Sequence, residues 1–342
     1  MRRITKMAVL IASAVVTAGA LAGCSGSSET AQTKAQAETK ADSEKAGSEE
    51  ASDDTSWPDS TVSIVVGASA GGGTDLLARV FADQLTQKLG QSFVVVNVTG
   101  AGGSNATNQV YDAEPDGNTI CFYHNAMIVN SVTNVTDYSF EDFVPGPHVV
   151  TDAATGLYVS AKAEYKTYPE LIEYCKAHPG EVTVGVESAG YTYYMVKSFE
   201  KATGVQFKYV DVGSNADKMT ALLGGHIDVV PCQYSTAKGY IESGDFVALG
   251  FPTEERSEIF PDVPTAKEQG VDWLYNGYEF GFWLTPGTDP AIAAKLDTAV
   301  KELMEDPAVQ EKIRSIGNEP TYLSPEEYKD MFAKITEEYK QY

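Results

Sequence analysis

One short motif in the sequence is typical of an enzyme: Gly67-Ala68-Ser69-Ala70-Gly71 is a literal G-x-S-x-G. It lies between the β-branched run 61–66 and a helical pattern, where a hydrolase places its nucleophilic serine. Such a serine needs a base, an orienting acid and an oxyanion donor from an earlier loop. Ser69 follows the first expected strand of the folded region, and no spacing selects His124 or His226 as its base. A secreted serine hydrolase that uses Ser69 therefore stands as the alternative function.

A second glycine turn, Gly100-Ala101-Gly102-Gly103-Ser104-Asn105, follows the next expected strand. It lacks the third glycine of G-x-G-x-x-G, and the sequence has no G-x-x-x-x-G-K-[ST], so neither dinucleotide nor triphosphate binding is supported. Both glycine turns precede helices, whose unpaired N–H groups and dipole favour an anion. Either turn alone fits an ordinary tight turn, but two on successive strands are harder to explain that way. A side chain at Gly102 is expected to block close backbone approach to such an anion.

The composition excludes several classes of protein. The chain has 342 residues with Lys+Arg 25 and Asp+Glu 48, a formal net charge of −23, which excludes a general nucleic-acid binder. There is no HExxH, CxxC pair or EF-hand spacing, and the four histidines are scattered. We therefore expect neither a metal nor a cofactor.

Strand and helix patterns alternate along the chain, which implies parallel sheets covered by helices and an α/β fold. The tail from Asp289 is mostly helical, and Ser324-Pro325-Glu326-Glu327 is typical of an N-cap with Pro at N1 and Glu at N3. The expected strands are 61–66, 93–97, 118–123, 157–160, 182–186, 207–210, 227–230 and 246–250, and the expected helices are 74–89, a short one ending at Tyr111, 168–178, 191–203, 216–223 and 236–243.

The N-terminus is typical of an export signal. Basic residues precede an apolar run that is short for a membrane span and ends in Leu21-Ala22-Gly23-Cys24. This end resembles a bacterial lipobox, so residues 1–23 are the expected signal peptide and Cys24 the expected lipidation site. The other interpretation is a cleaved signal followed by an incidental cysteine. Residues 25–56 are Ser, Ala, Thr, Glu and Lys with almost no apolar bulk, as in a flexible acidic tether. We expect an extracytoplasmic protein that only its lipid holds to the membrane.

Three cysteines remain after this segment, Cys121, Cys175 and Cys232. An odd number outside the cell leaves at least one free thiol. Cys121 and Cys232 lie in apolar, strand-like stretches, which favours buried inert thiols over a nucleophile.

Several motifs, each weak alone, resemble in their order and spacing the substrate receptors of tripartite tricarboxylate transporters, also called Bug receptors. The resemblance covers residues 57–342 and rests on Trp57-Pro58-Asp59, Ala70-Gly71-Gly72-Gly73-Thr74-Asp75, Gly100-Ala101-Gly102-Gly103, Pro115-Asp116-Gly117-Asn118-Thr119, Leu222-Leu223-Gly224-Gly225-His226-Ile227-Asp228, Phe260-Pro261-Asp262-Val263-Pro264-Thr265, Glu268-Gln269-Gly270 and Thr285-Pro286-Gly287-Thr288. The chain departs from the family at Gly67-Ala68, where a Pro and an aromatic residue are usual, and at Val96-Asn97-Val98-Thr99, where Glu-Asn-Arg-Pro is usual.

The resemblance implies a two-lobed fold like that of type II periplasmic binding proteins, each lobe a mostly parallel sheet flanked by helices, with a ligand cleft between the lobes. Residues 57–152 and 263–342 are the expected first lobe and 153–262 the second, with closure about the connections 150–157 and 252–263. The implied partners are a small organic carboxylate, such as a di- or tricarboxylate, and a two-subunit integral membrane transporter. A lipoprotein with an adhesive or scaffolding role is a remote third possibility.

The ligand is expected at loops that follow strands in both lobes, since ligands of open α/β sheets lie at the carboxyl ends of strands. No arginine lies in the first-lobe loops, so backbone N–H groups, hydroxyls and bridging water would bind the carboxylate. Tyr191, Tyr193 and Tyr194 add aromatic faces, although core packing is expected for at least one of them. The predicted ligand contacts are Ser69, Ala70, Gly71, Gly72, Thr74, Asp75, Gly100, Ala101, Gly102, Gly103, Asn105, Asn125, Ser188, Ala189, Gly190, Tyr191, Thr192, Gly213, Ser214 and Asn215.

Overall fold

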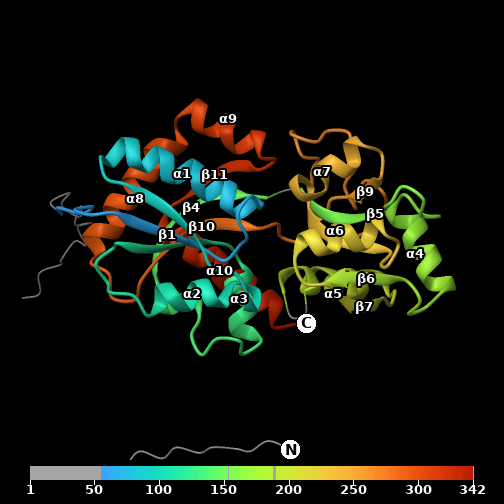
Figure 1. The fold of residues 1–342 in the computed structure, drawn as a ribbon. Helices are drawn as coiled ribbons and strands as arrows, with labels where there is room; N and C mark the ends of the chain where they lie inside the picture. Colours follow the sequence, from blue (N-terminus) through green and yellow to red (C-terminus); the bar gives the residue numbers. More distant parts are fainter. Residues whose placement is uncertain (1–54, 153, 188–189, 342) are drawn as a thin grey trace, which may run out of the picture. The chain divides into compact units, whose positions relative to one another are not determined.

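The computed structural model of the chain describes residues 55–152, 154–187 and 190–341 (Figure 1). The predicted signal peptide, Cys24 and all but the last two residues of the predicted tether lie outside these ranges. The described residues form two sheets, each flanked by helices, which confirms the predicted two-lobed α/β fold. We call the six-stranded sheet with its helices the first lobe and the five-stranded sheet with its helices the second lobe.

The sheet of the first lobe has the strand order β11-β4-β10-β3-β1-β2. Strands β1, β2 and β3 run parallel to one another, so the turns that follow them meet at one edge of the sheet. The strands are β1 (Val62–Val66), β2 (Phe93–Asn97), β3 (Thr119–Tyr123), β4 (Val144–Thr151), β10 (Glu279–Leu284) and β11 (Glu319–Leu323).

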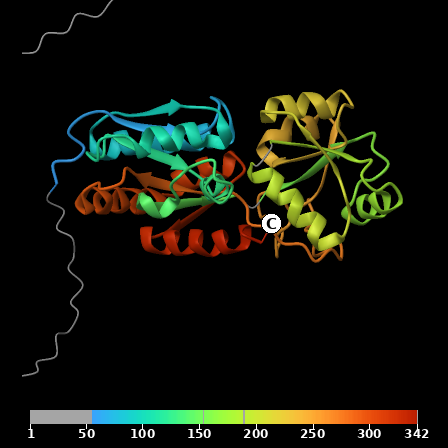
Figure 2. The same ribbon diagram turned by 90° about the horizontal axis from the view of Figure 1, so that it is seen from below.

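Alternate side chains of this sheet point into two different cores. Ile64 and Phe122 pack on the side of α1 (Gly73–Leu89), α8 (Pro290–Met304) and α9 (Pro307–Ser315). Val65 and Trp283 pack on the opposite side, which Figure 2 views, against α2 (Ser104–Tyr111), α3 (Ala126–Val132) and α10 (Pro325–Tyr339). Two 3₁₀ turns complete this lobe, η1 (Ala101–Gly103) and η2 (Phe140–Asp142).

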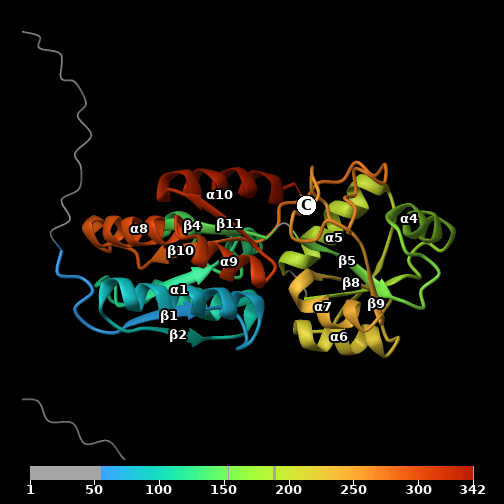
Figure 3. The ribbon, with the colours of Figure 1, turned by 90° about the horizontal axis from the view of Figure 1, so that it is seen from above.

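The second lobe repeats this layering around a sheet of order β7-β6-β8-β5-β9. Helices α4 (Tyr168–Ala177) and α5 (Tyr191–Thr203) cover one face, and α6 (Asn215–Leu223) and α7 (Tyr234–Glu242) cover the other (Figure 3). The strands are β5 (Thr155–Ser160), β6 (Thr183–Val186), β7 (Lys208–Asp211), β8 (Val229–Gln233) and β9 (Phe246–Gly250).

Local signals account for the helix ends that the sequence predicts. Gly90 ends α1 in the left-handed conformation with φ 74°, as expected for a C-terminal glycine. Ser324 and Glu327 form the predicted capping box of α10, in which Glu327 N donates to Ser324 Oγ at 3.4 Å and Ser324 N donates to Glu327 Oε2 at 2.9 Å.

Two features of the fold differ from the sequence prediction. Both sheets are mixed rather than mostly parallel, because β10 and β4 run antiparallel to their neighbours in the first sheet and β5 does so in the second. The sequence pattern also missed β4, β10, β11 and α3. Strand β4 contains two prolines and a glycine, and β10 and β11 pair with strands far away in sequence, so no local repeat indicates them.

The chain passes from the first sheet to the second between β4 and β5, and it returns between β9 and β10. The segment between β9 and β10 first packs against the second lobe. Trp273 packs edge-on against Tyr168 and Phe199 of the second lobe, and its Nε1 donates to Ser198 Oγ at 2.8 Å. The predicted lobe boundaries, with residue 263 opening the return to the first lobe, stay a prediction. No helix within the described ranges is long and apolar enough to cross a membrane.

Candidate ligand-binding site

The G-x-S-x-G segment forms the turn between β1 and α1. Gly72 N donates to Ser69 O at 3.1 Å and closes the turn, and Gly72 is the N-cap of α1 with extended backbone angles. Because glycine has no side chain, no side-chain hydrogen bond caps α1. Ser69, Ala70 and Gly71 are exposed, whereas Thr74 in the first helical turn is buried.

Asp75 holds this turn together from beneath. It is 1% exposed, and its carboxylate accepts hydrogen bonds from Gly71 N at 2.8 Å, Arg79 Nε at 2.9 Å and Asn97 Nδ2 at 2.9 Å. Burial opposes ionisation, but these hydrogen bonds and the charge of Arg79 outweigh it and hold the pKa of Asp75 below its ordinary value. The geometry therefore makes Asp75 a positioning residue for the turn, and its predicted contact with a ligand stays a prediction.

The second glycine turn curls around Tyr123, the last residue of β3. All four residues of Gly100-Ala101-Gly102-Gly103 have positive φ, at 109°, 49°, 60° and 86°. The Tyr123 hydroxyl donates to Gly102 O at 3.0 Å, and Asn130 Nδ2 donates to the same oxygen at 3.1 Å. A Cβ atom at Gly103 would collide with the Tyr123 hydroxyl, and one at Gly102 would lie 2.9 Å from Asn130 Oδ1. Packing within the protein therefore excludes a side chain at Gly102 and at Gly103, independently of any ligand.

The two turns of the first lobe lie against each other. A Cβ atom at Gly67 would lie 2.9 Å from the Cα atom of Gly103. Asn97 Nδ2 bridges the first turn by donating to Ala68 O at 3.0 Å, and Asn105 Nδ2 closes the second by donating to Thr99 O at 3.0 Å. The predicted first-lobe contacts are therefore brought together.

Asn125, a further predicted contact, is fully buried. Its Nδ2 donates to Gly277 O at 3.1 Å and to the Tyr339 hydroxyl at 3.2 Å, and its Oδ1 accepts a long bond of 3.5 Å from Glu279 N. These bonds tie the end of β3 to the strand that returns from the second lobe. The structure thus uses this amide to connect chain segments.

In the second lobe, Gly190 is the N-cap of α5 and, like Gly72, makes no side-chain cap. Tyr191 is buried: its hydroxyl donates to Asn276 O, and its ring centroid lies 4.1 Å from that of Tyr278. Core packing is thus confirmed for this tyrosine. Thr192 is buried as well, while the predicted contacts Ser188 and Ala189 lie outside the described residues.

The remaining predicted loop, Gly213-Ser214-Asn215, starts α6. Ser214 Oγ accepts from Asp217 N at 3.3 Å and donates to Asp217 Oδ2 at 2.6 Å, so a side chain satisfies this helix start. Hydrogen bonds from Ser214 also lower the pKa of Asp217. The Ser214 hydroxyl is occupied, and Asn215 is the exposed first residue of the helix.

The described α-helices differ in whether a side chain caps their N-terminus. Helices α4, α6, α8, α9 and α10 each have a side-chain cap. Helices α1, α2, α3, α5 and α7 have none. The uncapped helices follow the carboxyl ends of strands β1, β2, β3, β6 and β8, with η1 between β2 and α2. The capped helices α4, α6, α8 and α10 also follow strands, so among the described helices it is the glycine N-caps of α1 and α5 that leave helix starts without a side-chain partner at the predicted loops.

Sequence reasoning missed several polar residues at these strand ends. Gln233 ends β8 and is 7% exposed, and its Oε1 lies 3.1 Å from the place of a Cβ atom at Gly73, the first residue of α1. Asp152 is 1% exposed, accepts from Ala154 N at 2.9 Å and from the Thr155 hydroxyl, and burial raises its pKa to about 6. Lys218, in the first turn of α6, is 2% exposed. A lysine in a helical pattern predicts a solvent-facing side chain, so no local signal indicates that Lys218 is buried.

The geometry gives no support to a catalytic triad. No hydrogen bond joins Ser69 Oγ to a histidine within the described ranges. His124 Nδ1 accepts from Ala126 N at 3.2 Å, and burial lowers the pKa of His124 to about 3. His148 is fully buried and pairs with Glu279 at 2.9 Å, in strands β4 and β10. Cys121, Cys175 and Cys232 are free and buried, with pKa values raised by burial, as expected of inert thiols.

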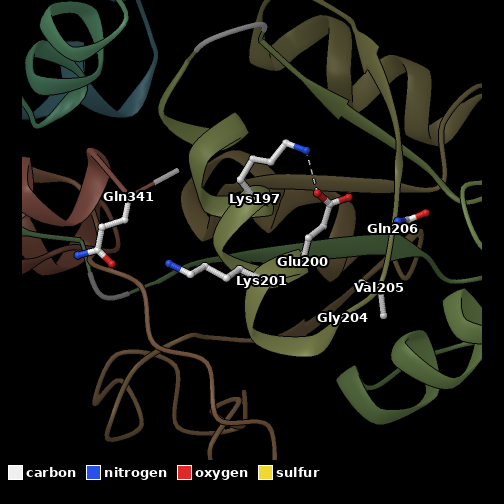
Figure 4. A pocket seen from close by; sticks show the side chains of 7 residues that line it. All are labelled: Lys197, Glu200, Lys201, Gly204, Val205, Gln206 and Gln341. Carbon is white, nitrogen blue, oxygen red and sulfur yellow. Dashed lines mark hydrogen bonds and ion pairs between the residues drawn. The ribbon is translucent and has the colours of Figure 1, made fainter.

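Two surface hollows lie elsewhere, both lined by residues of the second lobe and the first also by Gln341, which follows α10. One of 420 Å³ surrounds the end of α5 and includes the Lys197–Glu200 ion pair (Figure 4). The other, of 570 Å³, lies between α4 and the segment around Gly270. None of the predicted ligand contacts lines either hollow, and within the described ranges no group of His, Cys, Asp and Glu side chains has a metal-binding arrangement.

The model of the tripartite tricarboxylate transporter family receptor matches residues 77–341. The UPF0065 protein in the gbd 5′ region of Cupriavidus necator is 33% identical over 287 residues, which cover 83% of this chain and 86% of that protein. Protein BugT of Bordetella pertussis is 29% identical over 81% of this chain and 86% of its own length.

Solved structures of other proteins are also similar to this chain. An R. palustris protein with adipate is 27% identical with a TM-score of 0.77, covering 83% of this chain and 96% of that one. MatC from Rhodopseudomonas palustris, with bound malate, is 25% identical with a TM-score of 0.70, covering 83% and 98%. The periplasmic binding protein BugD is 26% identical with a TM-score of 0.75, covering 83% and 97%.

Proposed function

The chain belongs to the family of tripartite tricarboxylate transporter receptors, and from this we propose that it binds a small organic carboxylate outside the cytoplasm and delivers it to a two-subunit integral membrane transporter. Adipate and malate in the two R. palustris structures support a carboxylate as the solute. The periplasmic binding protein BugD supports an extracytoplasmic location. We propose that the protein acts as a receptor and not as an enzyme.

The single observation that carries the carboxylate assignment is the set of uncapped helices at the strand ends. Helices α1 and α2 follow the neighbouring parallel strands β1 and β2, and glycines occupy both N-cap positions. In the second lobe α5 starts in the same way at Gly190. The starts of α1 and α5 have N–H groups without an intrahelical partner, and a carboxylate can accept hydrogen bonds from them. At α2 the N–H of the first residue, Ser104, already donates to Ala101 O.

The magnitudes favour this assignment despite the acidic chain. The net charge of −23 repels an anion at long range, but salt screens that field over about 8 Å at physiological ionic strength. A helix dipole contributes roughly 0.3–1 kcal/mol, and each hydrogen bond to a charged group about 1.5–3 kcal/mol. Short-range terms at two helix starts therefore exceed the screened repulsion.

The test is a thermal-shift panel of carboxylates and amino acids, run beside a fluorophosphonate label for reactive serines. A receptor is stabilised by its solute, by about 2.7 kcal/mol at 100 times the dissociation constant, and takes up no label. Labelling of Ser69, with no carboxylate in the panel stabilising the protein, would establish the hydrolase alternative instead.

The anchoring and the binding residues complete the proposal. Lipidated Cys24 would hold the protein at the outer face of the membrane through a tether over residues 25–56. The solute would contact the turns Ser69–Asp75 and 100–105 of the first lobe and residues 188–192 and 213–215 of the second. A bound structure with the solute touching one lobe alone would contradict this sharing.

A further inference from the structure

Lys218 is a buried cation at the strand edge where the second-lobe loops meet. It lies in the first turn of α6, which follows β7. The carboxylates that act on its ammonium group are those of Glu187, directly after β6, and Asp211, the last residue of β7. Strands β7, β6 and β8 are neighbours and run parallel, so the ammonium lies over their shared carboxyl-terminal edge.

The ammonium group is poorly paired for a group so deeply buried. Lys218 is 2% exposed, and its Nζ donates one long hydrogen bond of 3.4 Å, to Asn215 Oδ1. Within the described ranges no carboxylate oxygen lies within ion-pair distance of it. An ammonium has three donors, and a buried charge is normally paired and hydrogen-bonded because its desolvation is costly. Burial accordingly lowers the pKa of Lys218. The site lacks an anionic partner.

The position of Lys218 at the carboxyl ends of parallel strands, where ligands of α/β folds bind, favours a partner that comes from the solute. The start of α6 presents N–H donors, which Ser214 caps, and it cannot pair with the ammonium, because the ammonium is itself a donor. Glu187 acts on Lys218 and also, after burial, raises the pKa of Tyr123, the residue that shapes the second glycine turn. Lys218 therefore lies at the sheet edge where the ligand loops of the second lobe are predicted.

We propose that Lys218 is a specificity-determining residue, whose ammonium binds a second anionic group of the solute while the helix starts of the first lobe bind the first. This inference rests on the proposed function. A solute with one carboxylate leaves the buried ammonium unpaired, and a solute with two acidic groups pairs it. The protein then prefers dianions over monoanions of the same length.

Calorimetry on the full chain tests this with matched pairs of probes: succinate and butyrate, glutarate and pentanoate, adipate and hexanoate. The parent is expected to bind at least one dicarboxylate about 10- to 100-fold more tightly than its monocarboxylate partner. Lys218→Met removes the charge and keeps the apolar stem, so the protein folds, and the preference should fall to within about threefold. The matched control, Lys176→Met, removes an exposed lysine of α4 in the same lobe and should keep the preference.

The outcomes separate the two proposals. If the parent binds dicarboxylates and monocarboxylates equally, or if Lys218→Met weakens both members of a pair by the same factor, the role of Lys218 is overturned and the receptor function stands. If the parent binds no member of any pair, the proposed function is overturned together with this inference.

Discussion

The hydroxyl group of Tyr123 donates a hydrogen bond of 3.0 Å to the carbonyl oxygen of Gly102, and this bond joins the end of a central strand to the second glycine turn. The turn holds consecutive residues with positive φ, a conformation that costs free energy in Ala101 and is sustained by its surroundings. Tyr123 is therefore a positioning residue for the backbone of the proposed carboxylate site.

Tyr123→Phe should lower the free energy of unfolding by about 0.5–1.5 kcal/mol, the usual net contribution of one hydrogen bond. It should also weaken carboxylate binding, because the turn loses one of two donors to Gly102 O. Denaturant unfolding and calorimetry measure the two effects. Tyr322→Phe, which removes a 2.8 Å bond to Asp297 in the same lobe, should cost similar stability and leave affinity unchanged. If Tyr123→Phe and Tyr322→Phe lose the same affinity, Tyr123 does not position the carboxylate site.

Asp152 predicts a pH dependence of stability at the passage between the sheets. Its pKa is raised from 3.8 to about 6, chiefly by burial, so the folded state prefers the protonated carboxyl. The protonated carboxyl of Asp152 contributes about 3 kcal/mol to the free energy of unfolding. This contribution is fully present below pH 3.8 and is lost as the pH rises through about 6. Asp152→Asn should remove this component, so its advantage over the parent should grow between pH 4 and pH 7. Unfolding curves at several pH values that run parallel for both proteins would refute this account.

Cys24→Ser should release the protein from the membrane without changing its affinity for the solute, since the tether separates anchoring from binding. Fractionation of cells and calorimetry on the released protein measure the two properties. A Ser variant that stays in the membrane fraction at high salt would show that Cys24 is not the lipidated residue.

Part of this site is readable from the sequence because it depends on local signals. The glycines at 72, 103 and 190 mark helix starts after strands, and Ser324 marks a capped one. The contacts that hold each turn against the rest of the lobe depend on long-range packing, and no pattern indicates them. Asp75 is an example: it lies in helix α1, and its partner Asn97 is the last residue of strand β2, so the sequence does not indicate their hydrogen bond.

The same limit applies to the polar residues that sequence reasoning missed. Lys218 is buried because α6 packs against the sheet of the second lobe, which no local pattern indicates. At Gly102 the structure limits what a substitution can test. The sequence suggests Gly102→Val as a test of anion binding, but the substitution would fail for structural reasons, because φ is 60° and Asn130 lies too close.

Gly72 offers a cleaner test than Gly102. Its backbone is already extended, with φ −77° and ψ 165°, and a Cβ atom would meet only Ser69 O, at 3.2 Å. Gly72→Asp places a carboxylate at the N-cap, where it can accept from the first N–H groups of α1. It should stabilise the free protein by a few tenths of a kcal/mol while competing with the solute for the same donors.

The most direct measurement is calorimetry of a bound carboxylate with the parent, Gly72→Asp and Ser324→Asp. The last variant adds the same charge at the N-cap of α10, which is already capped by a side chain. If the uncapped start of α1 binds the solute, Gly72→Asp should lose more than tenfold in affinity with no loss of thermal stability, and Ser324→Asp should bind like the parent. A Gly72→Asp protein that binds the carboxylate as tightly as the parent would contradict the account.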